Sequence, residues 1–148
     1  MNRKEKYPDT DVFHFHNANP KGKYTTDCVV RAISTATGIP YETVIRELAE
    51  LQIKTGYDTA DDTLYAKYLN LKGWIKHKQP RHWDNTKYTG KDFCGEIKCG
   101  YAGDFPELEY QPIIAHIGGH HVVAIISGVI WDTWNSSDGC IGNYWAKC

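Results

Sequence analysis

Cys28 is the side chain whose type and position best suit chemistry. It follows Thr25-Thr26-Asp27, in which Thr26 or Asp27 can cap the start of a helix. A thiol in the first helical turn faces free backbone N–H groups and the positive end of the helix dipole, and both favour the thiolate. The same N–H groups can hold the oxyanion of a tetrahedral intermediate. Cys28 is therefore a candidate nucleophile, and the plain alternative is a buried helical cysteine.

His121 is the candidate general base. It opens the apolar run Val-Val-Ala-Ile-Ile directly after Gly118-Gly119, which places an imidazole at the edge of a predicted strand. The small residues beside it leave room for a substrate, so we expect Gly119 and His120 to contact the substrate. A histidine beside a thiol can take its proton and later return one to a leaving group.

The length of the turn after this strand decides which residue is the candidate third catalytic group. If Ser127-Gly128 is a two-residue hairpin turn, Val123 lies opposite Asp132, and Asp132 shares a face with His121 at about 7–8 Å. A three-residue turn would instead place Asn135 opposite His121. We expect Asp132 to orient the imidazole, because the shorter turn leaves more of the apolar run paired, and Asn135 is the alternative.

The remaining patterns predict a single α+β domain over residues 1–148, with helices first and strands after. Helical periodicity begins at Asp27 and recurs over about 41–54 and 60–71, where Gly73 is a natural C-cap. Short strands are predicted over 112–117, 121–126, 129–134 and 141–145. The predicted divisions are an extended N-terminal arm (1–24), a helical half (25–75), a long loop region (76–111) with one short helix near 91–94, and a β half (112–148).

Composition narrows the classes of partner. The chain has 17 basic and 18 acidic residues, so its charge gives no reason to expect binding to nucleic acid or to an anionic membrane. No stretch reaches the roughly 18 apolar residues of a membrane span, and the basic start has no apolar run behind it. We therefore expect a cytoplasmic protein whose five cysteines stay reduced.

A metal site is the other chemistry that the residue types allow. Two histidines, His14 and His16, lie two positions apart, and further candidate ligands are scattered along the chain: His77, His82, Cys94, Cys99, Cys140 and Cys148. None of these makes the tight paired spacing of a zinc finger or ribbon. We therefore expect no metal and no cofactor.

The quoted segments resemble those of a known superfamily. Asn19-Pro20, followed by Thr-Asp-Cys-Val-Val-Arg-Ala-Ile over residues 26–33, resembles the nucleophile segment of papain-like cysteine peptidases, most of all a group of small phage and prophage proteins. The resemblance continues in Tyr68-Leu69, Gly73-Trp74, Gln79-Pro80-Arg81, residues 121–125, Asp132-Thr133-Trp134 and residues 142–145, and so covers most of the chain after residue 17.

The resemblance implies a papain-like fold, in which N-terminal helices with Cys28 on the first core helix pack on a C-terminal antiparallel sheet that carries His121 and Asp132. A cleft between the halves would bind an extended acyl substrate, with Trp134 in its wall.

One departure concerns the oxyanion. Papain-like enzymes commonly have a glutamine about six residues before the nucleophile, where this chain has Gly22, so the Asn19 amide, ahead of that of Asn17, is the candidate replacement. The equal alternative is that Asn19 is a turn residue before Pro20 and that backbone N–H groups alone hold the oxyanion.

These inferences predict a cysteine-dependent hydrolase of peptide, isopeptide or amide bonds, encoded by a phage and acting on a peptide or protein substrate. The alternative is an inactive papain-like scaffold that binds a host or phage partner. Fold does not fix function, and the aromatic excess of ten Tyr and five Trp suits a binding surface as well as a core.

Overall fold

The computed structural model describes residues 1–99, 108 and 111–147. Within this part of the chain the fold is α+β, as predicted. The helices are α1 (Arg3–Lys6), α2 (Cys28–Thr37), α3 (Tyr41–Thr55), α4 (Asp62–Leu71) and α5 (Gly90–Cys99). The strands are β1 (Phe13–Phe15), β2 (Ile75–His77), β3 (Ile113–Ile117), β4 (His121–Ile126), β5 (Val129–Asp132) and β6 (Ile141–Ala146).

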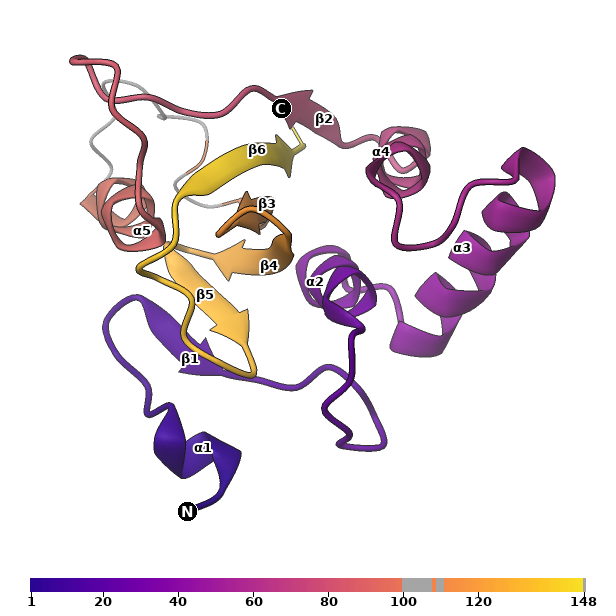
Figure 1. The fold of residues 1–148 in the computed structure, drawn as a ribbon, viewed down its shortest axis with the longest axis horizontal. Helices are drawn as coiled ribbons and strands as arrows, with labels where there is room; N and C mark the ends of the chain where they lie inside the picture. Colours follow the sequence, from indigo (N-terminus) through magenta and orange to yellow (C-terminus); the bar gives the residue numbers. More distant parts are fainter. Residues whose placement is uncertain (100–107, 109–110, 148) are drawn as a thin grey trace.

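All of these strands form one sheet in the order β1-β5-β4-β3-β6-β2 (Figure 1). Its neighbours are antiparallel except at one edge, where β1 runs parallel to β5 and Phe15 lies opposite Asp132. The sheet is therefore mixed, which corrects the expectation of an antiparallel sheet. The reason is that the N-terminal arm supplies an edge strand, which the sequence pattern did not reveal.

Helices cover both faces of the sheet (Figure 1). Residues of β4 alternate between two buried clusters, because successive side chains of a strand point to opposite faces. Val122 and Ala124 pack with α2, α3 and α4, whereas Val123 and Ile125 pack with α5. The region between 76 and 111, predicted as a long loop, thus contributes the ten-residue helix α5 that closes the second core.

Helix α2 is the element that positions the thiol. Its buried residues Ala32, Ile33 and Ala36 recur at helical spacing and face the sheet. The helix ends at Gly38, whose φ of 77° is the left-handed conformation that glycine adopts without strain. Helix α4 also ends close to its predicted C-cap, at Lys72, and the next residue is Gly73 with φ 86°.

The N-terminal arm is more ordered than predicted. It contains α1 and β1, and Phe13 is fully buried against β5 and α5. Cys148 and most of 100–110 lie outside the described residues. In the part of the chain that is described, no helix is long and apolar enough to cross a membrane.

A core substitution in β1 tests whether the arm belongs to the fold. We expect Phe13→Ala to lower the free energy of unfolding by about 3–5 kcal/mol, because it removes a fully buried ring from the core. Denaturant titration measures this. The control is Trp83→Ala, whose side chain is 96% exposed and whose loss should change stability by less than about 0.5 kcal/mol. Equal effects of the two changes would mean that the arm is not part of the core.

Candidate active site

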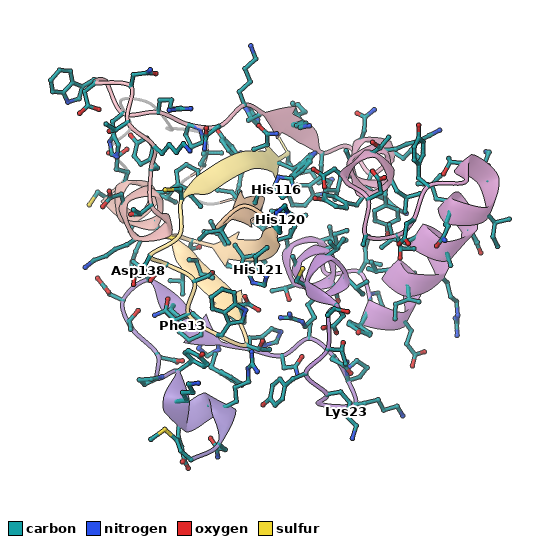
Figure 2. The ribbon with its side chains drawn as sticks, in the orientation of Figure 1. Phe13, Lys23, His116, His120, His121 and Asp138 are labelled. Atoms are coloured by element: carbon teal, nitrogen blue, oxygen red, sulfur yellow. The ribbon has the colours of Figure 1, made fainter. Side chains whose placement is uncertain are left out.

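A cavity of about 950 Å³ lies between the start of α2 and the ends of β3, β4 and β5. Cys28 and His121 both line it, as do the predicted substrate contacts Gly119, His120 and Trp134. Figure 2 places His120 and His121 on the side of the sheet that faces α2. The structure therefore brings these five predicted residues to one cavity.

The β4–β5 turn decides which residue meets His121. Ile126 pairs with Val129, so Ser127 and Gly128 form a two-residue turn, and both have positive φ angles of 50° and 75°. Positive φ at both central residues is the geometry of a type I′ hairpin turn. The register is thus the one from which Asp132 was predicted.

His121 and Asp132 are in direct contact. The Nε2 atom of His121 lies 2.5 Å from Oδ2 of Asp132, and Asp132 is only 2% exposed. This bond leaves Nδ1 as the ring nitrogen that can meet the Cys28 thiol, and the two side chains lie close enough for each to shift the pKa of the other. A carboxylate that accepts from one ring nitrogen fixes the orientation and tautomer of the imidazole.

Trp134 packs on this pair. Its ring centroid lies 4.8 Å from that of His121, with an interplanar angle of 40°. The indole therefore covers one face of the imidazole as well as lining the cavity. Covering a charge-assisted hydrogen bond with apolar surface strengthens it, because the local dielectric falls.

The pKa values of the pair shift in opposite directions. Burial by itself would raise the pKa of Cys28, but hydrogen bonds from His121 and from the Val122 N–H, with the charges of His121 and Arg31, lower it below its ordinary 9.0. Burial likewise opposes protonation of His121, yet Asp132 and Cys28 raise its pKa to about 9. Both shifts favour a thiolate–imidazolium pair over a neutral thiol and a neutral imidazole.

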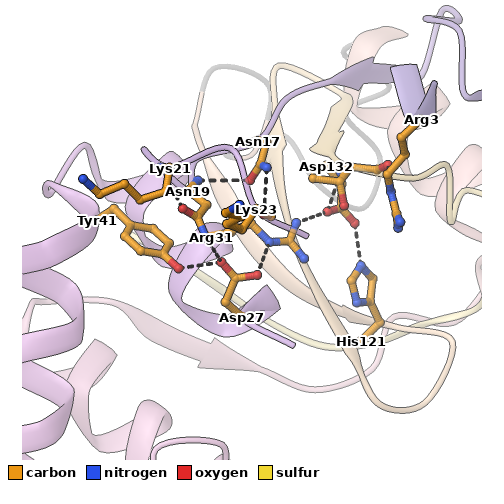
Figure 3. A network of polar contacts seen from close by, with 11 residues as sticks. Arg3, Asn17, Asn19, Lys21, Lys23, Asp27, Arg31, Tyr41, His121 and Asp132 are labelled. Atoms are coloured by element: carbon orange, nitrogen blue, oxygen red, sulfur yellow. Dashed lines mark hydrogen bonds and ion pairs between the residues drawn. The ribbon is translucent and has the colours of Figure 1, made fainter. Parts of the chain in front are cut away.

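Arg31 links the two halves of this site (Figure 3). Its Nε donates to Asp27 at 2.8 Å, and its Nη1 donates to Asp132 in a buried ion pair. Asp27 also accepts a hydrogen bond from the Tyr41 hydroxyl at 2.5 Å. Asp27, the residue before Cys28, is thus joined through the guanidinium of Arg31 to Asp132, which holds His121. Asp27 occupies the N-cap position, but its side chain makes no cap bond because it is occupied by Arg31 and Tyr41.

Two predicted candidates lie elsewhere. The Asn19 amide donates to Asp27 at 3.3 Å, and its carbonyl oxygen accepts from the Lys21 N–H, so it stabilises the arm and does not line the cavity. Its assignment to the oxyanion is therefore corrected. Asn135 accepts from the Ser137 N–H at 3.0 Å in the turn after β5, because the two-residue hairpin gives the place beside His121 to Asp132.

No sequence pattern indicated the part of the cavity wall that α4 and β3 form. Tyr65 from α4 and His116 from β3 are hydrogen-bonded to each other, and Tyr65 donates to Asp62 at 3.0 Å. All three line the cavity. They come from elements whose pairing no local pattern specifies. By contrast, Arg31 lies four residues after Asp27, a spacing at which opposite charges meet on a helix.

The scattered histidines and cysteines do not gather in the described part of the chain. No group of three or more His, Cys, Asp or Glu residues there is placed to hold a metal ion. His14 bonds Asp9 through Nδ1, and the rings of His14 and His16 pack against Trp131. Their alternation in β1 is that of an extended strand.

Comparison with known proteins adds no assignment: no family model matches the chain, and no curated protein or solved structure matches it.

The pKa shifts predict how the thiol reacts with pH. We expect the rate of Cys28 alkylation by iodoacetamide to rise along a titration whose midpoint lies below 9.0. In His121→Ala the midpoint should move up, because the thiolate loses a hydrogen bond and a positive charge while its burial remains. Mass spectrometry of each cysteine measures the rates. Cys94, whose pKa burial raises to about 12, is the internal control and should not label at neutral pH. An unchanged midpoint in the variant would contradict the coupling.

The buried ion pair makes a second prediction. Arg31→Met should lower the free energy of unfolding by about 3–5 kcal/mol, because it leaves the Asp132 carboxylate buried without its cation. The matched control is Arg46→Met on α3, whose contact with Glu42 is long at 3.8 Å and exposed, and which should cost less than about 1 kcal/mol. Chemical denaturation compares the two. Similar losses would show that the Arg31 bridge is not a stabilising contact.

Proposed function

We propose that this chain is a papain-like cysteine hydrolase of peptide, isopeptide or amide bonds, encoded by a phage. Cys28 is the nucleophile, His121 its proton partner and Asp132 the residue that orients His121. The observation that carries the proposal is the series Cys28–His121–Asp132: Cys28 and His121 line one cavity, and the buried Asp132 holds His121 from behind. The thiol lies at a helix start and its pKa is lowered. The order Cys, His, Asp along the chain is that of the papain clan.

The mechanism uses the thiolate–imidazolium pair. The Cys28 sulfur attacks the carbonyl carbon, and His121 gives its proton to the leaving amine as the C–N bond breaks. Water then attacks the thioester, with His121 accepting its proton, and this releases the acid and restores the thiol. Asp132 stays ionised throughout and holds the ring through Nε2.

The oxyanion is stabilised by backbone N–H groups at the start of α2. The first N–H groups of a helix have no partner within it, so those at the start of α2, where Cys28 is the first residue, are available to the oxyanion. The Asn19 side chain supplies no donor here, since it does not line the cavity and its amide donates to Asp27. One oxyanion donor is typically worth about 10²–10³ in rate, so we expect turnover to be slow for this class.

That same missing donor favours a second candidate function. A chain with the thiol and base in place but a poor oxyanion site suits a scaffold that binds a partner in the cleft without turnover. The two functions differ in one measurable step, which is the release of an acyl group from Cys28.

A fluorogenic peptide library with an acyl-trapping arm tests the proposal. We expect hydrolysis by the wild-type chain, with an acyl adduct on Cys28, and loss of both in Cys28→Ala and His121→Ala. The matched control is Cys99→Ala, an exposed cysteine outside the cavity, which should retain activity. Labelling of Cys28 without hydrolysis of any member would support the binding scaffold, and equal activity in Cys28→Ala would refute both.

A further inference from the structure

One carboxylate, that of Asp62, lines the cavity that holds the thiol. Asp62 is the first residue of α4, and its side chain is 72% exposed and lines the same cavity as Cys28. The carboxylate comes from a different element than the catalytic residues. It is not part of the Arg31 network that holds Asp132.

Asp62 also lines a second cavity. This one, of about 380 Å³, shares Asp62, His116 and Gly119 with the first and extends to Gln79 and Asn143. The cleft therefore continues past the thiol on the α4 side, and Asp62 lies where its two parts meet. A substrate extended along the cleft would pass this carboxylate.

One carboxylate oxygen of Asp62 is positioned but unused. Oδ1 accepts from the Tyr65 hydroxyl at 3.0 Å, which fixes the side chain. Oδ2 lies 3.8 Å from Nε2 of His116, beyond hydrogen-bond distance, and among the described residues it accepts no hydrogen bond. Because an ionised carboxylate can accept several hydrogen bonds, Oδ2 is free for a donor from a ligand.

The negative charge is not cancelled by its neighbour. Burial lowers the pKa of His116 below its usual value in spite of the attraction of Asp62, so the imidazole is mainly neutral at pH 7. Arg3 of α1 also lines the cavity. Its Nε donates to the carbonyl of Thr133, the residue after β5, so this guanidinium is held at the β5 end of the cavity.

Arg31 also lines the first cavity but is paired with Asp27 and Asp132, and Lys87 lines the second cavity together with Asp62. Among the described residues that line the two cavities, Asp62 is the single carboxylate.

We propose that Asp62 forms a subsite for a cationic group, so that the substrates of the Cys28 site are peptides or proteins with a lysine, an arginine or a free α-amino group close to the bond that is cleaved. This inference rests on the proposed function for the identity of the substrate. The electrostatic preference itself depends only on the cleft. An ammonium or guanidinium donates to Oδ2 as a charge-assisted hydrogen bond, while Tyr65 keeps Oδ1 in place.

Small thiol reagents of different charge test the subsite on the intact chain. Trimethylammonium-ethyl and sulfonato-ethyl methanethiosulfonate each form a mixed disulfide with a thiolate and release methanesulfinate, and they differ in the sign of their charge. We expect Asp62→Asn to lower the ratio of cationic to anionic labelling rates at Cys28 by about threefold or more, as removal of one nearby exposed charge implies. Asparagine keeps the acceptor for Tyr65, so the fold is retained.

Two controls make the result specific. Asp138→Asn removes a charge from an exposed residue outside both cavities, on the α5 side in Figure 2, and should leave the ratio at Cys28 unchanged. The ratio at the exposed Cys99 should be unchanged in both variants. An unchanged ratio at Cys28 in Asp62→Asn, or an equal fall in Asp138→Asn, would overturn the subsite.

Peptide probes then test the substrate class. In tripeptide chloromethyl ketones that carry lysine or its uncharged analogue norleucine at one position at a time, we expect faster capture of Cys28 with lysine for at least one position, and loss of that preference in Asp62→Asn. No such preference at any position would overturn the substrate class. Neutral methyl methanethiosulfonate distinguishes failure of the Asp62 subsite from failure of the proposed function. If this reagent labels Cys28 no faster than Cys99, the activated thiol is refuted. The ratio of cationic to anionic labelling rates at Cys28 can still be measured in that case.

Discussion

The buried bridge from Asp27 through Arg31 to Asp132 is the interaction on which the site depends. Arg31 is on α2, the helix that begins with Cys28. Asp132 is the last residue of β5 and the hydrogen-bond partner of His121. Two carboxylates around one guanidinium leave a single negative charge, which the protonated His121 balances. Taking these charges out of water is costly, and the geometry must be accurate to repay it. The bridge therefore specifies one position of α2 against the sheet more strictly than apolar packing does.

The bridge explains the local chemistry as well as the packing. Oδ1 of Asp132 accepts from Arg31 and from the Thr133 N–H, and this fixes the carboxylate so that Oδ2 faces His121. The positive charge of Arg31 also contributes to the lowered pKa of Cys28. Arg31 thus influences the orientation of His121 and the ionisation of Cys28 together. Arg31 also binds the Asp27 carboxylate, which therefore makes no N-cap bond to α2. The Asp27 side chain instead takes part in the bridge that joins α2 to the sheet.

Local signals in the sequence were sufficient for part of this. The helical pattern after Asp27, the glycines before His121 and the Ser127-Gly128 turn each specify short-range geometry, and together they led to Asp132. Long-range pairing was not accessible in the same way. The alternation of Phe13, His14 and Phe15 is too short to distinguish a strand from an arm, and its partner β5 lies more than a hundred residues later. Asn19 was misassigned for the same reason, since its bond to Asp27 depends on how the arm folds back.

The parallel pairing of β1 with β5 has a consequence for biosynthesis. The His16 N–H donates to the carbonyl of Asp132 at 2.8 Å, so the end of β5 is held from both sides, by the arm and by β4. Cys28 is synthesised early, and His121 and Asp132 are synthesised late. The N-terminal arm cannot dock until β5 has been synthesised, because β1 pairs with β5. Contacts between residues so far apart in the chain form slowly and late in folding. A nascent chain consequently carries a Cys28 thiol with an ordinary pKa, and the pKa is lowered only in a chain whose last hairpin has been synthesised and docked.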